Sequence, residues 1–254
     1  MEKFLSQNYL TTFSQMGLRE TTQGFWQSPH IKPVSYPIEG NAEYAELEEE
    51  SFWFCHRNAC ILAVLNRFPP QAGQIWDVGG VNGFVALAIQ KSGIKVTLVE
   101  PGLGAKTAFQ RGVRSVIQAS FDDLKLKPGF LPSVGLFDVI EHIQDDLRFL
   151  QKIFDVIEPN ERVYLTVPAY KILWSVEDKQ AQHFRRYTIK RLKKLFAQSG
   201  FVIDFSTYFF SFLPFPVFFF RTILTLLGRK KHFVDHEKAH SLPSGFVGIF
   251  LITL

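Results

Sequence analysis

The chain has 254 residues, 46% of them hydrophobic, which suits one α/β domain with additions better than two complete domains. Its net charge of +4 is too mild to indicate nucleic-acid binding, because no long stripe of lysine and arginine accompanies it. The two cysteines, Cys55 and Cys60, form neither a disulfide framework nor a zinc pattern, and residues 1–20 lack the apolar stretch of a secretory signal. A cytoplasmic location is therefore expected.

The first half of the chain predicts an α/β domain. Residues 1–42 are polar with weak periodicity and are expected to form an N-terminal extension, whereas residues 43–67 have helical spacing and are expected to form a helical lid. Apolar strands then alternate with amphipathic helices, at 74–78, 95–100, 115–118, 134–140 and 162–167 for the strands and 82–91, 104–111 and 145–157 for the helices. This alternation predicts a parallel sheet covered on both faces, with ligands outside the carboxyl ends of its strands.

The second half adds a helix over 189–199, with Thr188 as its N-cap and Gly200 at its end, and a sixth strand that starts at Phe201. We expect the core domain to cover 43–209, a Phe-rich insert 210–232 and a C-terminal tail 233–254. The tail contains the only candidate for a last strand, 246–254. Either these residues form that strand, or the tail is shortened.

A glycine turn follows the first strand of the core domain, in the stretch IWDVGGVNGF, residues 75–84. Glycines let the backbone turn sharply and approach a ligand, and the start of the next helix offers free N–H groups. The dinucleotide fingerprint is absent, because Val81 and Phe84 stand where two of its glycines would be. Glu100 ends the second strand, where a carboxylate can accept hydrogen bonds from both ribose hydroxyls. An adenosine ligand without phosphates is favoured over a nicotinamide dinucleotide.

Five ordered blocks carry a family resemblance: DVGGVNGF, LVEPG (98–102), LFDVIEHIQDD (136–146), LTVPAYKILWSVED (165–178) and HFRRYT (183–188). Over roughly residues 43–225 the chain resembles class I S-adenosylmethionine-dependent methyltransferases, most closely the bacterial type 11/12/23 group. The resemblance implies a Rossmann-like, doubly wound, mostly parallel seven-stranded sheet of order 3-2-1-4-5-7-6, with S-adenosylmethionine as cofactor. It implies that the glycine turn holds the methionine part of the cofactor and the acid after the second strand its ribose, with Asp77, Gly79, Gly80, Gly83 and Glu100 in these roles.

Four further residues are expected near the cofactor. Ser120 and Phe121 occupy the places where related enzymes often have residues that contact adenine, and Phe121 and the adjacent Asp122 are expected near the base. Asp138 lies in the DVIEH block. Arg57 is expected to reach the cofactor carboxylate from the preceding helix, although a solvated arginine on an ordinary amphipathic helix is the alternative.

Candidates for a catalytic base follow the fourth and fifth strands: Glu141 and His142 after the fourth, and Glu177, Asp178 and His183 after the fifth, with Glu141, His142 and His183 favoured. The alternative is that Glu141 and His142 shape the loop that covers the cofactor. Arg185 and Arg186 fit either an anion site or a structural role beside the Thr188 cap. Some quinone-directed methyltransferases that resemble this chain hold a divalent cation with a Glu–His pair. No metal is expected here, because the sequence shows no further cluster of histidines or carboxylates.

The Phe-rich stretch 208–232 approaches the length of a membrane helix, but Pro214, Pro216 and Arg221 interrupt it. Insertion into one leaflet is the favoured interpretation, and an acceptor pocket or a dimer interface is the alternative. The expected activity is methyl transfer to oxygen or nitrogen of an amphiphilic small-molecule, lipid-linked or quinone-like acceptor. The protein itself is expected to be cytoplasmic and to associate peripherally with the inner face of the membrane. A non-catalytic adenosine-binding or membrane-adaptor protein is the alternative function.

Overall fold

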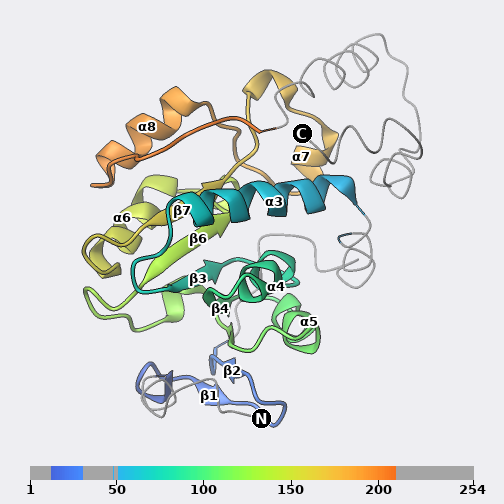
Figure 1. Cartoon of the computed structure of the whole chain (residues 1–254), viewed down its shortest axis with the longest axis vertical. Helices are drawn as coiled ribbons and strands as arrows, with labels where there is room; N and C mark the ends of the chain where they lie inside the picture. The colour runs from blue at the N-terminus through green and yellow to red at the C-terminus, as the bar shows by residue number, and fades with distance from the viewer. Residues whose placement is uncertain (1–12, 31–47, 49–50, 210–254) are drawn as a thin grey trace.

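The computed structural model describes residues 13–30, 48 and 51–209. Within them a seven-stranded sheet has the order β1-β2-β5-β4-β3-β6-β7, and every neighbouring pair is parallel except β1 and β2 (Figure 1). The strands are β1 Arg19–Glu20, β2 Trp26–Gln27, β3 Gln74–Val78, β4 Lys95–Val99, β5 Val116–Gln118, β6 Ser133–Phe137 and β7 Val163–Thr166. The described helices are α3 Phe52–Arg67, α4 Phe84–Lys91, α5 Gly104–Gln110, α6 Asp146–Val156, α7 Val176–Gln180 and α8 Ile189–Gln198.

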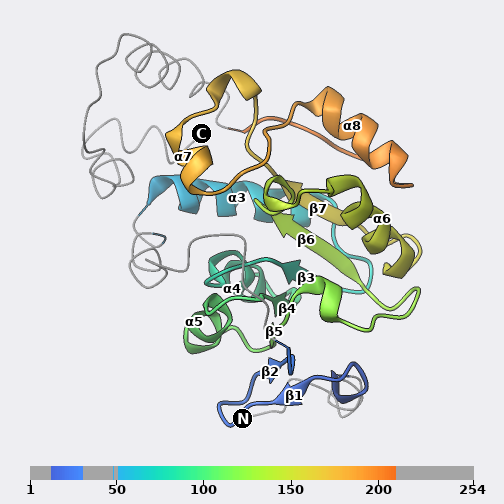
Figure 2. The same cartoon turned by 180° about the vertical axis from the view of Figure 1, so that it is seen from behind.

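The sheet has a hydrophobic core on each of its faces, because side chains alternate along each strand. In β3, Ile75 packs with α3, α4 and α5, whereas Trp76 packs with α6 and α8 on the other face. Both side chains are fully buried. Figures 1 and 2 show the same arrangement from opposite sides, with α7 and α8 at one end of the molecule and β1 and β2 at the other. The Rossmann-like, mostly parallel fold predicted from the sequence is confirmed.

Two of the seven strands come from a segment that the sequence placed in the N-terminal extension. Strand β2 pairs in parallel with β5, Trp26 opposite Ile117, and β1 pairs with β2 as the outermost strand. Phe13 is fully buried and contacts Trp26 and Trp76 edge to face, with ring centroids 5.5 and 6.3 Å apart. Residues 13–30 therefore belong to the sheet and to its core. Strands of two residues are too short for a periodic pattern to reveal them.

The prediction of a sixth strand that starts at Phe201 is wrong for residues 201–209, which the structure describes. Residues 201–209 form no strand, and their aromatic side chains pack on neighbouring elements instead: Phe201 lies 5.1 Å from the ring of Phe154, and Phe205 lies 5.6 Å from that of Phe68. In the implied order this strand pairs with a seventh strand, whose candidate, 246–254, lies outside the described residues. The insert 210–232, the rest of the tail and most of residues 43–51 also lie outside them. None of the described helices has both the length and the apolarity needed to cross a membrane.

The predicted cap of α8 is confirmed, since Oγ1 of Thr188 accepts a hydrogen bond from the backbone N–H of Arg191 at 3.3 Å. Replacing Thr188 by alanine should lower the free energy of unfolding by about 1 kcal/mol, because one N–H of the first turn loses its acceptor. Urea unfolding measures this change. Thr188→Ser, which keeps the hydroxyl, is the matched control, and an equal loss in both variants would contradict a capping role.

Candidate active site

The glycine turn after β3 is shaped by contacts within the chain itself. Gly79 and Gly83 have φ of +79° and +73°, a region that favours glycine. A Cβ on Gly80 would lie 2.3 Å from Cδ1 of Leu98 and 2.5 Å from Oδ2 of Asp77, so no larger residue fits there. A Cβ on Gly83 would lie 2.6 Å from that of Ala108 on α5. The glycines are thus required to pack the turn closely on β4 and α5.

Asp77 lies beneath this turn and is fully buried, and neither of its carboxylate oxygens has a hydrogen-bond partner among the described residues. Burial raises the pKa of Asp77 to about 7; nearby Arg57 opposes the shift and Glu100 adds to it. Ionisation of Asp77 in the folded protein therefore has a large electrostatic cost.

Glu100, directly after β4, is also fully buried. One carboxylate oxygen accepts the N–H of Val81 at 3.0 Å, and the other accepts the N–H of Gly102 at 2.6 Å. The side chain thus connects the glycine turn to the segment that follows β4. This position, at the carboxyl edge between two neighbouring strands, is the one that the sequence predicts for a ribose acceptor, although the contact itself stays a prediction.

Arg57, on α3, pairs with Asp138, the first residue after β6, with Nη1 and Oδ2 2.5 Å apart. Oγ1 of Thr166 donates to the other carboxylate oxygen of Asp138 at 3.0 Å, and Asp138 has a φ of +59°. The guanidinium of Arg57 also lies 5.2 Å from the ring centroid of Phe54. Arg57 and Asp138, which were both predicted to contact the cofactor, thus lie together at the carboxyl end of β6. Their ion pair attaches α3 to the turn after this strand.

Phe121 and Asp122 are placed differently from each other. Phe121 packs in the core, 5.6 Å from the ring of Phe149, whereas Asp122 is exposed and forms an ion pair of 2.6 Å with Lys152. Neither contact involves the glycine turn or Glu100. The predicted contact of these two residues with adenine stays a prediction.

The three favoured candidates for a catalytic base, Glu141, His142 and His183, lie close together in space. Glu141 and His142 form a 3-10 turn after β6, and His183 lies in the loop between α7 and α8. The imidazole rings of His142 and His183 are 4.7 Å apart, and the N–H of Phe184 donates to the backbone oxygen of Glu141 at 2.8 Å. One ligand-type atom from each of the three side chains lies within 4.8 Å of the others, so the group could hold a metal ion.

Burial sets the protonation of this group. Glu141 is 1% exposed, and burial first, then the negative charge of Asp138, raises its pKa well above the usual value. Burial and the neighbouring His183 lower the pKa of His142 to about 4. His142 is therefore neutral at neutral pH, and burial makes the ionised form of Glu141 unfavourable unless a positive charge accompanies it.

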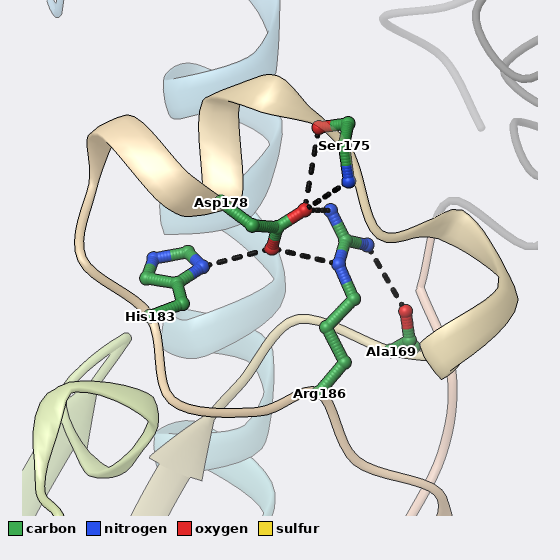
Figure 3. Close-up of polar contacts among 5 residues, drawn as sticks. All are labelled: Ala169, Ser175, Asp178, His183 and Arg186. Atoms are coloured by element: carbon green, nitrogen blue, oxygen red, sulfur yellow. Dashed lines mark hydrogen bonds and ion pairs between the residues drawn. The ribbon is translucent and has the colours of Figure 1, made fainter.

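Asp178, at the third position of α7, orients His183 (Figure 3). Its Oδ1 lies 2.9 Å from Nδ1 of His183, and Arg186 donates to both oxygens at 2.8 and 2.9 Å. The backbone N–H of Ser175 adds a fourth donor at 2.8 Å. Burial alone would raise the pKa of Asp178, but the hydrogen bonds from His183 and Arg186 outweigh it, and this pKa lies well below its usual value. Asp178 is therefore charged and fixed.

The two arginines of the HFRRYT block are engaged within the chain. Besides its pairing with Asp178, Arg186 donates to the backbone oxygen of Ala169 at 3.1 Å. Arg185 pairs with Asp146 at 2.7 Å, which also accepts a hydrogen bond from the hydroxyl of the buried Tyr187 at 2.9 Å. These contacts favour the structural role of the block over the anion site that the sequence left open.

The model of a methyltransferase-domain family matches residues 54–204, more than half of the chain. The chain belongs to the class I S-adenosylmethionine-dependent methyltransferases. The matched range contains the glycine turn, Glu100, Arg57–Asp138 and the group at Glu141. S-Adenosylmethionine is the cofactor, as predicted. No curated protein matches the sequence.

Two solved methyltransferases are similar in structure. One, from Thermotoga maritima, is described as a possible histamine N-methyltransferase; it is 18% identical, with a TM-score of 0.51 over 65% of this methyltransferase and 80% of that chain. The other is phosphoethanolamine N-methyltransferase 2 of Haemonchus contortus, in complex with phosphomonomethylethanolamine and S-adenosylhomocysteine; it is 19% identical, with a TM-score of 0.52 over 71% of this chain and 46% of that one. At these identities both establish the shared fold.

Proposed function

We propose that this methyltransferase transfers the methyl group of S-adenosylmethionine to an oxygen or nitrogen atom of an amphiphilic acceptor, either a small molecule or a lipid-linked or quinone-like compound. The observation that carries the proposal is the meeting of Glu141, His142 and His183 beside Asp138 at the carboxyl edge of β6. In methyl transfer the sulfonium supplies its own leaving group. The protein therefore has to position the acceptor and either remove the acceptor's proton or make that proton more acidic. This group is suited to that task.

The cofactor is proposed to lie across the carboxyl ends of β3 and β4. The turn that contains Gly79, Gly80 and Gly83 would follow its methionine part, and Glu100 would accept the ribose hydroxyls. Arg57 and Asp138 carry opposite charges at the adjoining edge of β6, and they suit the carboxylate and the ammonium of the methionine part.

Turnover is the direct test. Incubation with methyl-labelled S-adenosylmethionine and a lipid extract should yield S-adenosylhomocysteine together with label in the organic phase. His183→Gln should lower the rate at least 100-fold while cofactor affinity changes little, because His183 serves the acceptor. Label confined to water-soluble products would contradict an amphiphilic acceptor. Binding of the cofactor without any turnover would instead support the non-catalytic adenosine-binding protein.

Glu100→Ala should weaken cofactor binding by about 1 to 3 kcal/mol through the loss of the ribose contacts. Because Glu100 also braces the glycine turn, calorimetry should compare S-adenosylhomocysteine with an analogue that lacks both ribose hydroxyls. The substitution should affect the first ligand much more than the second. An equal effect on both ligands would assign Glu100 to bracing the turn alone.

A membrane surface is the proposed source of the acceptor, at the cytoplasmic face. The composition of the Phe-rich insert 210–232 supports this proposal, and α8 adds a basic face whose exposed residues are Lys190, Arg191, Lys193 and Lys194. Basic side chains on a surface helix favour anionic headgroups. The protein should float with liposomes that contain anionic lipid, and Lys193→Glu with Lys194→Glu should reduce this. A protein that stays at the bottom with either kind of liposome would remove the membrane from the proposal.

A further inference from the structure

The fold supplies Glu141 and His142 with a third ligand-type residue that the sequence places far from them. Their turn follows β6, whereas His183 follows α7, and the hydrogen bond from the N–H of Phe184 to the backbone oxygen of Glu141 joins the two segments at 2.8 Å. The rings of His142 and His183 are nearly perpendicular, at 81°. Because this backbone hydrogen bond holds the two segments together, the three side chains form a preorganised group.

Glu141 shows that this group lacks a partner. Its side chain is 1% exposed, and neither carboxylate oxygen accepts a hydrogen bond from any other described residue. Nδ1 of His142 is buried as well and has no hydrogen-bond partner within the described ranges. A buried carboxylate without donors is costly unless a proton or a cation neutralises it. Both unpartnered groups are donors of electron pairs, so the missing partner is an electrophile.

His183 is held in the form that can bind such a partner. Asp178 is an acceptor only, so Nδ1 of His183 donates to it, and in the neutral imidazole Nε2 then carries the lone pair. Asp178 lies between His183 and the guanidinium of Arg186, which fixes the carboxylate (Figure 3). A carboxylate that holds the outer nitrogen of a histidine is the usual support of a metal ligand, because it fixes the ring and raises its basicity.

We propose that Glu141, His142 and His183 bind one divalent transition-metal ion of the zinc class. Two imidazoles and one carboxylate are a ligand set that such ions prefer, and three protein ligands leave a coordination position open for a substrate atom. The sequence led to the opposite expectation, because the Glu–His pair stood without a neighbour; His183, supported by Asp178, completes the set.

The role of the ion rests on the proposed function and narrows its acceptor to a hydroxyl compound. The acceptor oxygen takes the open position, and the ion makes its hydroxyl more acidic, so that the proton leaves to water. An oxygen lone pair then forms the new bond to the methyl carbon while the C–S bond breaks and its electron pair stays on sulfur. With the ion bound, Nε2 of His183 is a ligand, and acidification by the ion replaces proton removal by the imidazole.

Metal binding can be tested without any acceptor. The full chain, made without a histidine tag and depleted of metal, is titrated with Zn²⁺ in a calorimeter and with Co²⁺ in an absorption spectrometer. One equivalent should bind, and Co²⁺ should give visible bands typical of low coordination number. Glu141→Gln and His183→Gln should each weaken binding at least 100-fold, and Asp178→Asn roughly 10- to 100-fold. His30→Gln, at an exposed histidine, is the matched control and should bind as the wild type does.

Equal Zn²⁺ affinity in the wild type and in both ligand variants would overturn the proposal, as would the absence of stoichiometric binding. Circular dichroism and S-adenosylhomocysteine binding show whether each variant is folded, and if one ligand variant fails to fold, the other decides. The two proposals fail separately. Methyl transfer that keeps its rate after removal of the ion leaves the proposed function standing and refutes the catalytic role of the ion. Stoichiometric metal binding without turnover confirms the metal site and refutes the proposed function.

Discussion

Asp178→Ala should lower the free energy of unfolding by about 3 kcal/mol, because it leaves the half-buried guanidinium of Arg186 without its carboxylate. The substitution removes two charge-assisted hydrogen bonds from Arg186, one from the backbone of Ser175 and the contact with His183. The side chain of Asp178 is 1% exposed, so water cannot replace these partners without opening the loop between α7 and α8. Urea unfolding of the two proteins measures the loss.

A double-mutant cycle separates the ion pair from the rest of the network. Arg186→Met removes the charge but keeps much of the apolar stem, and the double variant should be less destabilised than the sum of the single ones, with a coupling of about 1 to 3 kcal/mol. Asp178→Asn, which keeps the size of the side chain, should fall between the wild type and alanine. Additive effects of the two substitutions would show that the pair contributes nothing beyond its separate members.

Asp77→Asn should stabilise the protein at neutral and alkaline pH. The folded protein keeps a proton on Asp77 up to a pH of about 7, whereas the unfolded chain releases it near 3.8. Between these values the folded state binds more protons than the unfolded state, so the stability of the wild type falls as the pH rises. The asparagine variant has no such term and should gain about 4 kcal/mol relative to the wild type between about pH 4 and about pH 8.

Urea unfolding at a series of pH values measures this difference. Asp155→Asn, at an exposed position on α6, is the control and should follow the wild-type curve. A difference between Asp77→Asn and the wild type that stays constant with pH would contradict the assignment of the cost to a buried charge.

The central part of the fold could be predicted from the sequence because its strands are near-continuous apolar runs separated by amphipathic helices. β3, β4 and β7 lie within the predicted ranges or match them. The predicted fourth strand ran to residue 140, but β6 ends at Phe137, because Asp138 turns the chain with a positive φ. The alternation in residues 201–209 indicated a strand, although those apolar residues pack against aromatic side chains of helices and loops. Periodicity reports which side chains are buried, and it cannot tell a paired strand from an extended segment.

The candidate site shows the same limit in another form. Glu141 and His142 are adjacent in the sequence, so their association needed no structure. His183 was predicted as a separate candidate, and its contact with the pair depends on the path of the loop that carries α7. Asp178 stood among several acids after the fifth strand, and only the geometry shows that it orients His183. The Arg57–Asp138 pair likewise joins residues far apart in the sequence, one on α3 and the other directly after β6.

The strand pair at the N-terminal end of the sheet also bears on solubility. Without β2, the edge of β5 would present unpaired backbone groups beside buried apolar residues such as Ile117, a template on which other chains can add. β2 covers that edge, and β1 closes the sheet with only two residues, the exposed and charged Arg19 and Glu20. An edge strand this short and this charged presents few backbone groups with which a strand of another chain could pair. Residues 13–30 thus protect the β5 side of the sheet against edge-to-edge aggregation.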